Sequence, residues 1–189
     1  MKTLSHLILT SVLVLFITAC NNETKTSKTD ASDTTEQADD KKSGQAFIED
    51  DEGKPNVLQI AIGSKDHSTL VAAVQAAELE NSLVNAGPLM VFAPTNDAFA
   101  ALPEGTVENL LKPENKEQLA HILKHHVTPG NYSKEFLKKF KKLGQASNGY
   151  VQIEVKGDDV YVGGAKILGS VPAGNGIVHV VDKVIIPEE

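Results

Sequence analysis

Apolar residues in this chain follow a helical period first and a strand period later. From Leu70 to Ala77 they recur at positions i, i+3, i+4 and i+7, which predicts an amphipathic helix behind Ser68, a good N-cap residue. Residues 89–92 form a short apolar run that follows a Gly-Pro break and precedes Pro94. Such a run is typical of a buried strand.

The stretch VFAPTNDAFAALP, residues 91–103, leads from that strand into a polar turn and then into alanines. Thr95 can cap a short helix over residues 96–102. Asp97 would then stand in the first turn, where free backbone N–H groups and the helix dipole favour a carboxylate. Thr95, Asn96 and Asp97 are therefore predicted to hold a strand-to-helix corner in shape.

A longer helix is predicted over PENKEQLAHILKHHV, residues 113–127, because a proline suits the first turn. His126 shares the apolar stripe of this helix with Leu119 and Leu123, so it should point inward. His121 and His125 should lie close to the opposite, polar face.

Residues 133–143, SKEFLKKFKKL, place Phe136, Leu137 and Phe140 on one side. Lysine side chains that surround them would form a solvated helix face or attract sulfated or phosphorylated glycans and lipid headgroups. The candidate binding surface consists of Lys134, Lys138, Lys139, Lys141 and Lys142, together with His125.

The remainder of the chain is strand-like. YVQIEV alternates apolar and polar residues, KGDD is typical of a turn, and VYVGG is typical of the returning strand of a hairpin. Farther along, GNG precedes the long apolar segment IVHVVDKVII. His179 shares a strand face with Ile177 and Val181, which indicates a packed histidine. Helices followed by mainly antiparallel strands predict an α+β fold.

The N-terminus has the features of a bacterial lipoprotein signal. A lysine at position 2, a short apolar core and Ile-Thr-Ala before Cys20 predict that residues 1–19 are a signal peptide. They also predict that Cys20, the single cysteine of the chain, is lipidated. The apolar core is about half of the roughly 20 residues that a membrane-spanning helix needs. Asn21, rather than Asp, after this cysteine resembles Gram-negative sorting patterns that favour the outer membrane of the cell envelope over retention at the inner one.

Residues 20–54 read as an acidic, disordered tether, because they contain almost no aliphatic side chains. The net charge of the whole chain is −7, and most of it lies in this tether. Residues 55–189 are then one domain of nearly neutral charge. All basic residues are lysine and none is arginine, a composition that speaks against nucleic acid as a partner.

Candidates for catalytic chemistry are few. His121 and His125 have the spacing to share a metal ion, but the glutamate of the H-E-x-x-H arrangement is absent. Asp97 and His126 would be an acid/base couple only if the fold brought them together. Nucleophile-elbow and phosphate-loop motifs are absent from the sequence. We therefore expect no enzyme activity, no cofactor and no metal.

Three segments together resemble the fasciclin domain, a cell-adhesion module. They are VFAPTNDAFAALP, ILKHHVTPG at residues 122–130 and GNGIVHVVDKVIIP at residues 174–187. The resemblance implies a β-wedge of about seven strands with a layer of helices, and no catalytic activity or cofactor. It also implies that His126 supports packing. A tyrosine linked to integrin binding in animal members is replaced here by His125.

The expected function is adhesion or recognition by a lipid-anchored envelope protein, whose partner is an envelope or extracellular protein or a polysaccharide. One alternative is a glycan or small-ligand binding protein that uses residues 134–142 or a pocket between the helices and the wedge. A second alternative is a metal-assisted enzyme that uses His121 and His125.

Overall fold

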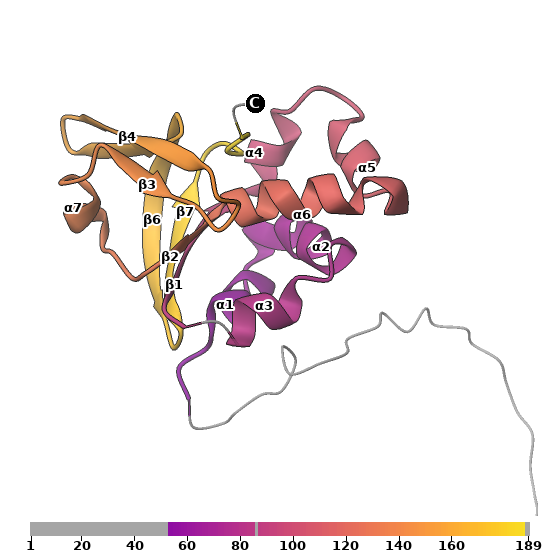
Figure 1. Cartoon of the computed structure of the whole chain (residues 1–189), viewed down its shortest axis with the longest axis horizontal. Helices are drawn as coiled ribbons and strands as arrows, with labels where there is room; N and C mark the ends of the chain where they lie inside the picture. Colours follow the sequence, from indigo (N-terminus) through magenta and orange to yellow (C-terminus); the bar gives the residue numbers. More distant parts are fainter. Residues whose placement is uncertain (1–52, 86, 188–189) are drawn as a thin grey trace, which may run out of the picture. The chain divides into compact units, whose positions relative to one another are not determined.

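The computed structural model describes residues 53–85 and 87–187 (Figure 1). The expected signal peptide, Cys20 and nearly all of the expected tether lie outside the described residues. Within the described ranges, none of the helices has both the length and the apolar character needed to cross a membrane.

Short helices dominate the first half of the domain, and in Figure 1 helices α1 to α6 lie together on one side of the sheet. The helices of the described residues are α1 (Val57–Ile62), α2 (Ser68–Ala76), α3 (Glu80–Asn85), α4 (Asn96–Ala100), α5 (Thr106–Leu110), α6 (Lys116–His125) and α7 (Lys134–Leu137), with 3-10 turns η2 (Lys65–His67) and η3 (Pro113–Asn115).

In the described part of the chain, seven strands form one sheet in the order β2-β1-β7-β6-β5-β4-β3. Among these strands only β1 and β7 pair in parallel, and the remaining neighbours are antiparallel. This arrangement confirms the α+β fold with seven mainly antiparallel strands. The strands are β1 (Leu89–Pro94), β2 (Val127–Pro129), β3 (Lys142–Gly144), β4 (Tyr150–Lys156), β5 (Asp159–Val162), β6 (Ala165–Ala173) and β7 (Gly176–Val181).

The sheet curls until its two outer strands approach each other. The backbone N–H of Ala146, just after β3, donates a 2.7 Å hydrogen bond to the carbonyl of Val127 in β2. Next to it, the Thr128 hydroxyl and the Gln145 side-chain amide are also hydrogen-bonded. The sheet is therefore a nearly closed wedge with an interior of its own.

Strand β1 supplies side chains to two separate cores, because successive residues of a strand face opposite sides. Val91 packs on the helical side, whereas Met90 and Phe92 fill the interior of the wedge. The helical core also contains Leu58, Leu70, Leu123 and Val178, and the wedge core contains Leu137, Val162, Ile167 and Val181.

The helix predicted from Leu70 to Ala77 is present and ends at Ala76. Glu78 adopts a left-handed conformation with φ 53°, so α3 starts in a new direction. In the lysine-rich segment the helix stops at Leu137, and Lys142 already belongs to β3. The expectation of one helix through residues 133–143 was wrong, because Leu143 is buried in the wedge core as a strand residue.

Three elements meet at the turn between β6 and β7. The Asn175 side chain accepts a 2.9 Å hydrogen bond from the first N–H of α1, at Val57, and donates one of 2.7 Å to the Leu83 carbonyl in α3. The Asn175 carbonyl accepts from the N–H of Leu89, where β1 starts. A Cβ on the adjacent Gly176 would collide with the backbone of Leu89. This turn therefore fixes α1, α3 and β1 relative to β7, and it requires glycine at position 176.

Candidate functional site

The strand-to-helix corner is held mainly by Asn96. The Thr95 hydroxyl accepts from the N–H of Ala98 at 3.3 Å, so Thr95 is the expected cap of α4. The Asn96 carboxamide oxygen accepts from the backbone N–H of Thr69 at 3.0 Å, and its nitrogen donates to the Lys65 carbonyl at 2.9 Å. Asn96 thus joins α4 to the start of α2.

This contact corrects the expectation for Ser68. Ser68 is the first residue of α2, and its hydroxyl donates to Asn96 instead of capping the helix. The helix N-terminus is capped from a distant part of the chain. Asp97 lies exposed in the first turn of α4, so Asn96 makes the tertiary contacts at this corner.

His126 connects helix α6 to the segment after β7. Its Nδ1–H donates to the Ile122 carbonyl at 2.8 Å, and its Nε2 accepts from the N–H of Ile185 at 2.9 Å. These bonds require a neutral ring with the proton on Nδ1. Burial lowers the pKa of His126 to about 4, since a charged ring would lose its solvation. The sequence prediction that His126 points inward is confirmed.

His179 has the same kind of role inside the wedge. Its Nδ1 lies 2.7 Å from the Ser170 hydroxyl, and its Nε2 lies 2.9 Å from the Tyr132 carbonyl. The ring stacks on Phe92. Burial lowers the pKa of His179, so the neutral ring, which donates from Nε2 and accepts at Nδ1, matches both partners. His179 is the packed histidine that the sequence predicts.

His125 is buried with 3% of its surface exposed, which contradicts its expected place on the polar face of α6. Its Nδ1 lies 2.8 Å from the Ser147 hydroxyl, and the ring is close to the backbone of Gly149. The loop after β3 covers this side of the helix end, which the sequence of the helix alone does not reveal. Burial also lowers the pKa of His125.

The metal and acid/base hypotheses gain no geometric support. His121 is exposed while His125 is buried, and in the part of the chain that the structure describes, no three His, Cys, Asp or Glu side chains converge on a common point. Both nitrogens of His126 are engaged in hydrogen bonds, so its ring has none left for exposed Asp97.

A partly exposed aromatic cluster accompanies the predicted lysines. The rings of Tyr132, Phe136 and Phe140 pack against one another with centroids 5.3 to 5.5 Å apart. Lys139 Nζ lies 5.0 Å from the centre of the Phe136 ring. Lys142 Nζ lies 4.6 Å from that of Tyr150 in β4. We call this surface, with Lys141, the aromatic–lysine face.

The five predicted lysines are not equivalent. Lys138 forms an ion pair of 2.9 Å with Glu135, and Lys134 and Lys138 are half-buried. Lys139, Lys141 and Lys142 are exposed, and within the described ranges they form no ion pair. These three amino groups are therefore available to an external partner.

Comparison with known proteins agrees with the motifs. The family model described as the Fasciclin domain matches residues 65–187. The chain belongs to the Fasciclin domain family. Members of this family are typically non-catalytic and related to adhesion or the extracellular matrix.

Relatives of this fasciclin domain come from bacteria and animals. Protein sll1483 of Synechocystis sp. is 46% identical over 132 residues, which cover 69% of this chain and 73% of that protein. The transforming growth factor-beta-induced protein ig-h3 of Sus scrofa is 34% identical over 69% of this chain, but the match spans only 19% of ig-h3. Among solved structures, a FAS1 domain pair from the insect cell adhesion molecule Fasciclin I gives a TM-score of 0.42 at 17% identity, covering 68% of this chain and 43% of that one.

Several key residues of this fasciclin domain were not identified from the sequence. Asn175 lies within the GNG motif, but the pattern does not reveal its bonds to α1 and α3. Asn56 caps α1 in a capping box with Gln59, and the Asn-x-x-Gln spacing before an apolar run could have indicated it. The ring cluster around Phe136 had only a weak signal, the Phe136/Phe140 spacing.

We predict that Asn96→Ala destabilises the domain by about 1 to 2 kcal/mol, because it removes the cap of α2 and its tie to η2. Asp97→Ala, at the neighbouring exposed position, should cost less than about 0.5 kcal/mol. Urea unfolding of both variants measures the difference. Equal losses of stability would show that Asn96 has no special role.

A second prediction concerns pH. Because the pKa of His126 is about 4 in the folded chain and about 6.5 when unfolded, the unfolded chain binds the proton first. The stability from the neutral ring is complete above pH ~6.5 and is lost as pH falls towards ~4.

His126→Gln should therefore be destabilised most at neutral pH, and its difference from wild type should shrink by about 3 kcal/mol between pH ~6.5 and ~4. Denaturant unfolding across this range measures it. His121→Gln, on the exposed face of the same helix, is the control and should follow wild type. Parallel stability curves for wild type and His126→Gln would exclude this linkage.

Proposed function

We propose that this protein is a lipid-anchored recognition module of the bacterial cell envelope and that it binds acidic polymers through the aromatic–lysine face. The observation that carries the proposal is this exposed face. Family membership supports an adhesion-type, non-catalytic role, and the lipoprotein signal that ends at Cys20 supports the anchor.

The chemistry of the face suits an acidic, ring-containing polymer such as a sulfated or phosphorylated polysaccharide. Phe136 is 41% exposed and Tyr150 is 65% exposed, and aromatic residues are enriched where proteins bind partners. Lysine amino groups beside these rings can pair with sulfate or phosphate. Rings and cations thus offer two complementary contacts to one polymer.

The aromatic–lysine face lies apart from the helical layer. Figure 1 shows α7, β3 and β4 on the side of the domain away from helices α1 to α6. Contacts there lie away from the Asn175 turn. The carbonyl of Tyr132 is hydrogen-bonded to His179, so the ring cluster is fixed to the interior of the wedge.

Binding to dextran sulfate at about 50 and 500 mM salt tests the face, with neutral dextran as the reference polymer. Changing Lys139, Lys141 and Lys142 to Gln should weaken binding at low salt by about tenfold or more, because three cations act together. The matched control changes three exposed lysines elsewhere, Lys65, Lys112 and Lys183, to Gln and removes the same charge.

The control variant should bind within about twofold of wild type. Equal losses of dextran sulfate binding in both variants would mean that net charge alone drives binding. Binding of dextran sulfate that does not decrease with salt would exclude the lysines as its contacts. A pull-down from intact envelope with the same pair of variants then tests the natural partner.

The anchor is tested separately. Cys20→Ser should move the protein from the membrane fraction to the soluble fraction, because the acyl chains would be lost. Fractionation of cells that express wild type or the variant measures this. Wild type in the soluble fraction, or a variant that stays with the membrane, would exclude anchoring at Cys20.

A further inference from the structure

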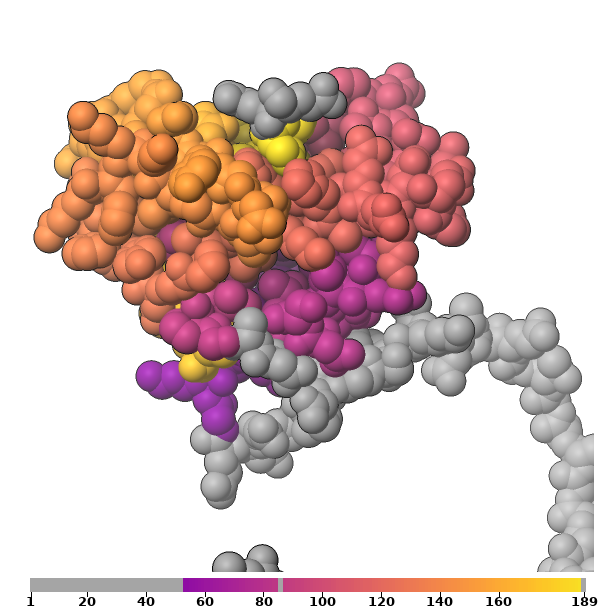
Figure 2. Space-filling view, viewed as in Figure 1, coloured from indigo at the N-terminus to yellow at the C-terminus, as the bar shows by residue number. Residues whose placement is uncertain are grey.

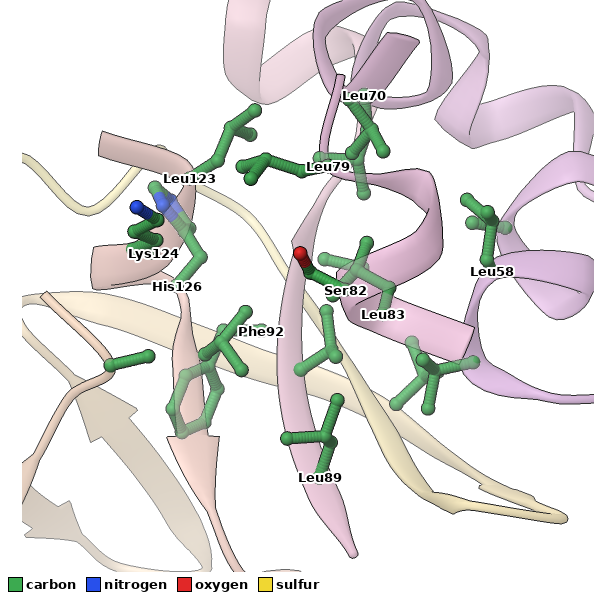
Figure 3. A pocket seen from close by; sticks show the side chains of 18 of the residues that line it. Leu58, Leu70, Leu79, Ser82, Leu83, Leu89, Phe92, Leu123, Lys124 and His126 are labelled. Atoms are coloured by element: carbon green, nitrogen blue, oxygen red, sulfur yellow. The ribbon is translucent and has the colours of Figure 1, made fainter. Parts of the chain in front are cut away.

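The helical side of the domain contains a cavity of about 250 Å³ between α1, α2, α3, β1 and the C-terminal end of α6. Its lining is almost entirely aliphatic, with Leu58, Leu70, Leu83, Leu89 and Leu123 directed around the space (Figure 3). In Figure 2 the surface is hollowed where the end of α6 meets α2 and α3. A ligand could enter there.

The size of the cavity restricts its occupant. A dry aliphatic cavity of about 150 Å³ is enough to bind benzene. Scaled from benzene, whose six carbons fit that cavity, a cavity of 250 Å³ has room for a chain of roughly ten carbons. A long acyl chain or a folded sugar would not fit inside.

Polar side chains in the lining are few. Lys124, on the last turn of α6, and Ser82, on α3, are exposed at the cavity, and Figure 3 shows the Ser82 hydroxyl directed into the space between them. His126 also borders the cavity, but both of its nitrogens are already hydrogen-bonded. Lys124 forms no ion pair within the described residues.

We propose that this cavity binds a medium-chain fatty acid, with the alkyl chain among the leucines and the carboxylate at Lys124 and Ser82. An aliphatic lining favours an apolar chain, and the single cation at the rim favours a ligand with one negative charge. Without Lys124 a carboxylate would be disfavoured, because the C-terminal end of α6 carries a partial negative charge. The proposal is independent of the aromatic–lysine face, which contributes no residue to this cavity.

Methyl NMR of the full chain carrying Cys20→Ser, which lacks the acyl chains of the proposed anchor, tests the site in detergent-free buffer with decanoate as the probe. We expect saturable shifts of the leucine and valine methyl signals from α1, α2, α3 and β1. Decanol and decylammonium are the matched probes without a negative charge. Decanoate should bind more tightly than either of them.

Two variants distinguish the contribution of the cavity volume from that of the Lys124 charge. Val71→Phe places a larger side chain in the cavity and should weaken binding of all chains by about tenfold or more. Lys124→Met retains an unbranched side chain without the charge. It should lower the affinity for decanoate about threefold to fivefold, in line with the loss of an exposed ion pair. Its affinity for decanol should stay within about twofold. Lys112→Met, at an exposed lysine outside the cavity, is the control for Lys124→Met.

Three results would overturn the proposal: no saturable shifts with decanoate up to millimolar concentration, shifts outside the cavity, or equal binding of decanoate and decylammonium. An unchanged decanoate affinity in Lys124→Met would exclude the carboxylate contact. Because Lys124 is exposed, this variant keeps the test valid even if Val71→Phe unfolds the domain.

Discussion

The fold depends on the parallel pairing of β1 with β7, which joins residues 89–94 to residues 176–181. Parallel strands cannot be joined by a tight turn, and here the whole segment from Thr95 to Asn175 passes between them. The Asn175 turn makes this long-range pairing specific, because one side chain satisfies the start of α1 and the end of α3. Gly176 lets the two backbones approach. The position of the helical layer on the sheet therefore follows from one turn.

Buried polar groups in this domain act as connectors. His126 and His179 each have both ring nitrogens hydrogen-bonded, and in each ring one of the two bonds reaches a segment far away in sequence, at Ile185 and Tyr132. Such fully satisfied groups favour a unique packing. A general base needs a nitrogen that can reach a substrate proton. Histidines whose two ring nitrogens are both hydrogen-bonded within the domain are suited to a structural role. This role agrees with a family that is typically non-catalytic.

Local patterns predicted most of the elements. The apolar run at residues 89–92, the Thr95 cap and the alternation of β4 have their signals within a few residues, and all three are present. His125 was placed wrongly because the residues that bury it, Ser147 and Gly149, follow on a later loop. Asn96 and Asn175 were missed as connectors for the same reason, since their partners lie 27 and 118 residues away. Helical periodicity carries no information about contacts of that range.

The lysine-rich segment illustrates the same limit on the functional side. Its five lysines were visible in the sequence, but their differences depend on Glu135, on the chain turning into β3, and on Tyr150 from β4. Only the three-dimensional arrangement separates the available amino groups from the engaged ones.

Helix α3 connects the architecture with the proposed ligand. A helix of six residues is far below the roughly 12 to 15 that are marginally stable alone, so α3 depends on Asn175 at its end and on the packing of Leu79 and Leu83. Both leucines border the cavity, where they lack partners on one side, and such a gap forfeits part of their dispersion energy. An alkyl chain in the cavity would supply those contacts. Ligand binding and the ordering of α3 should therefore favour each other, because each provides surface that the other lacks.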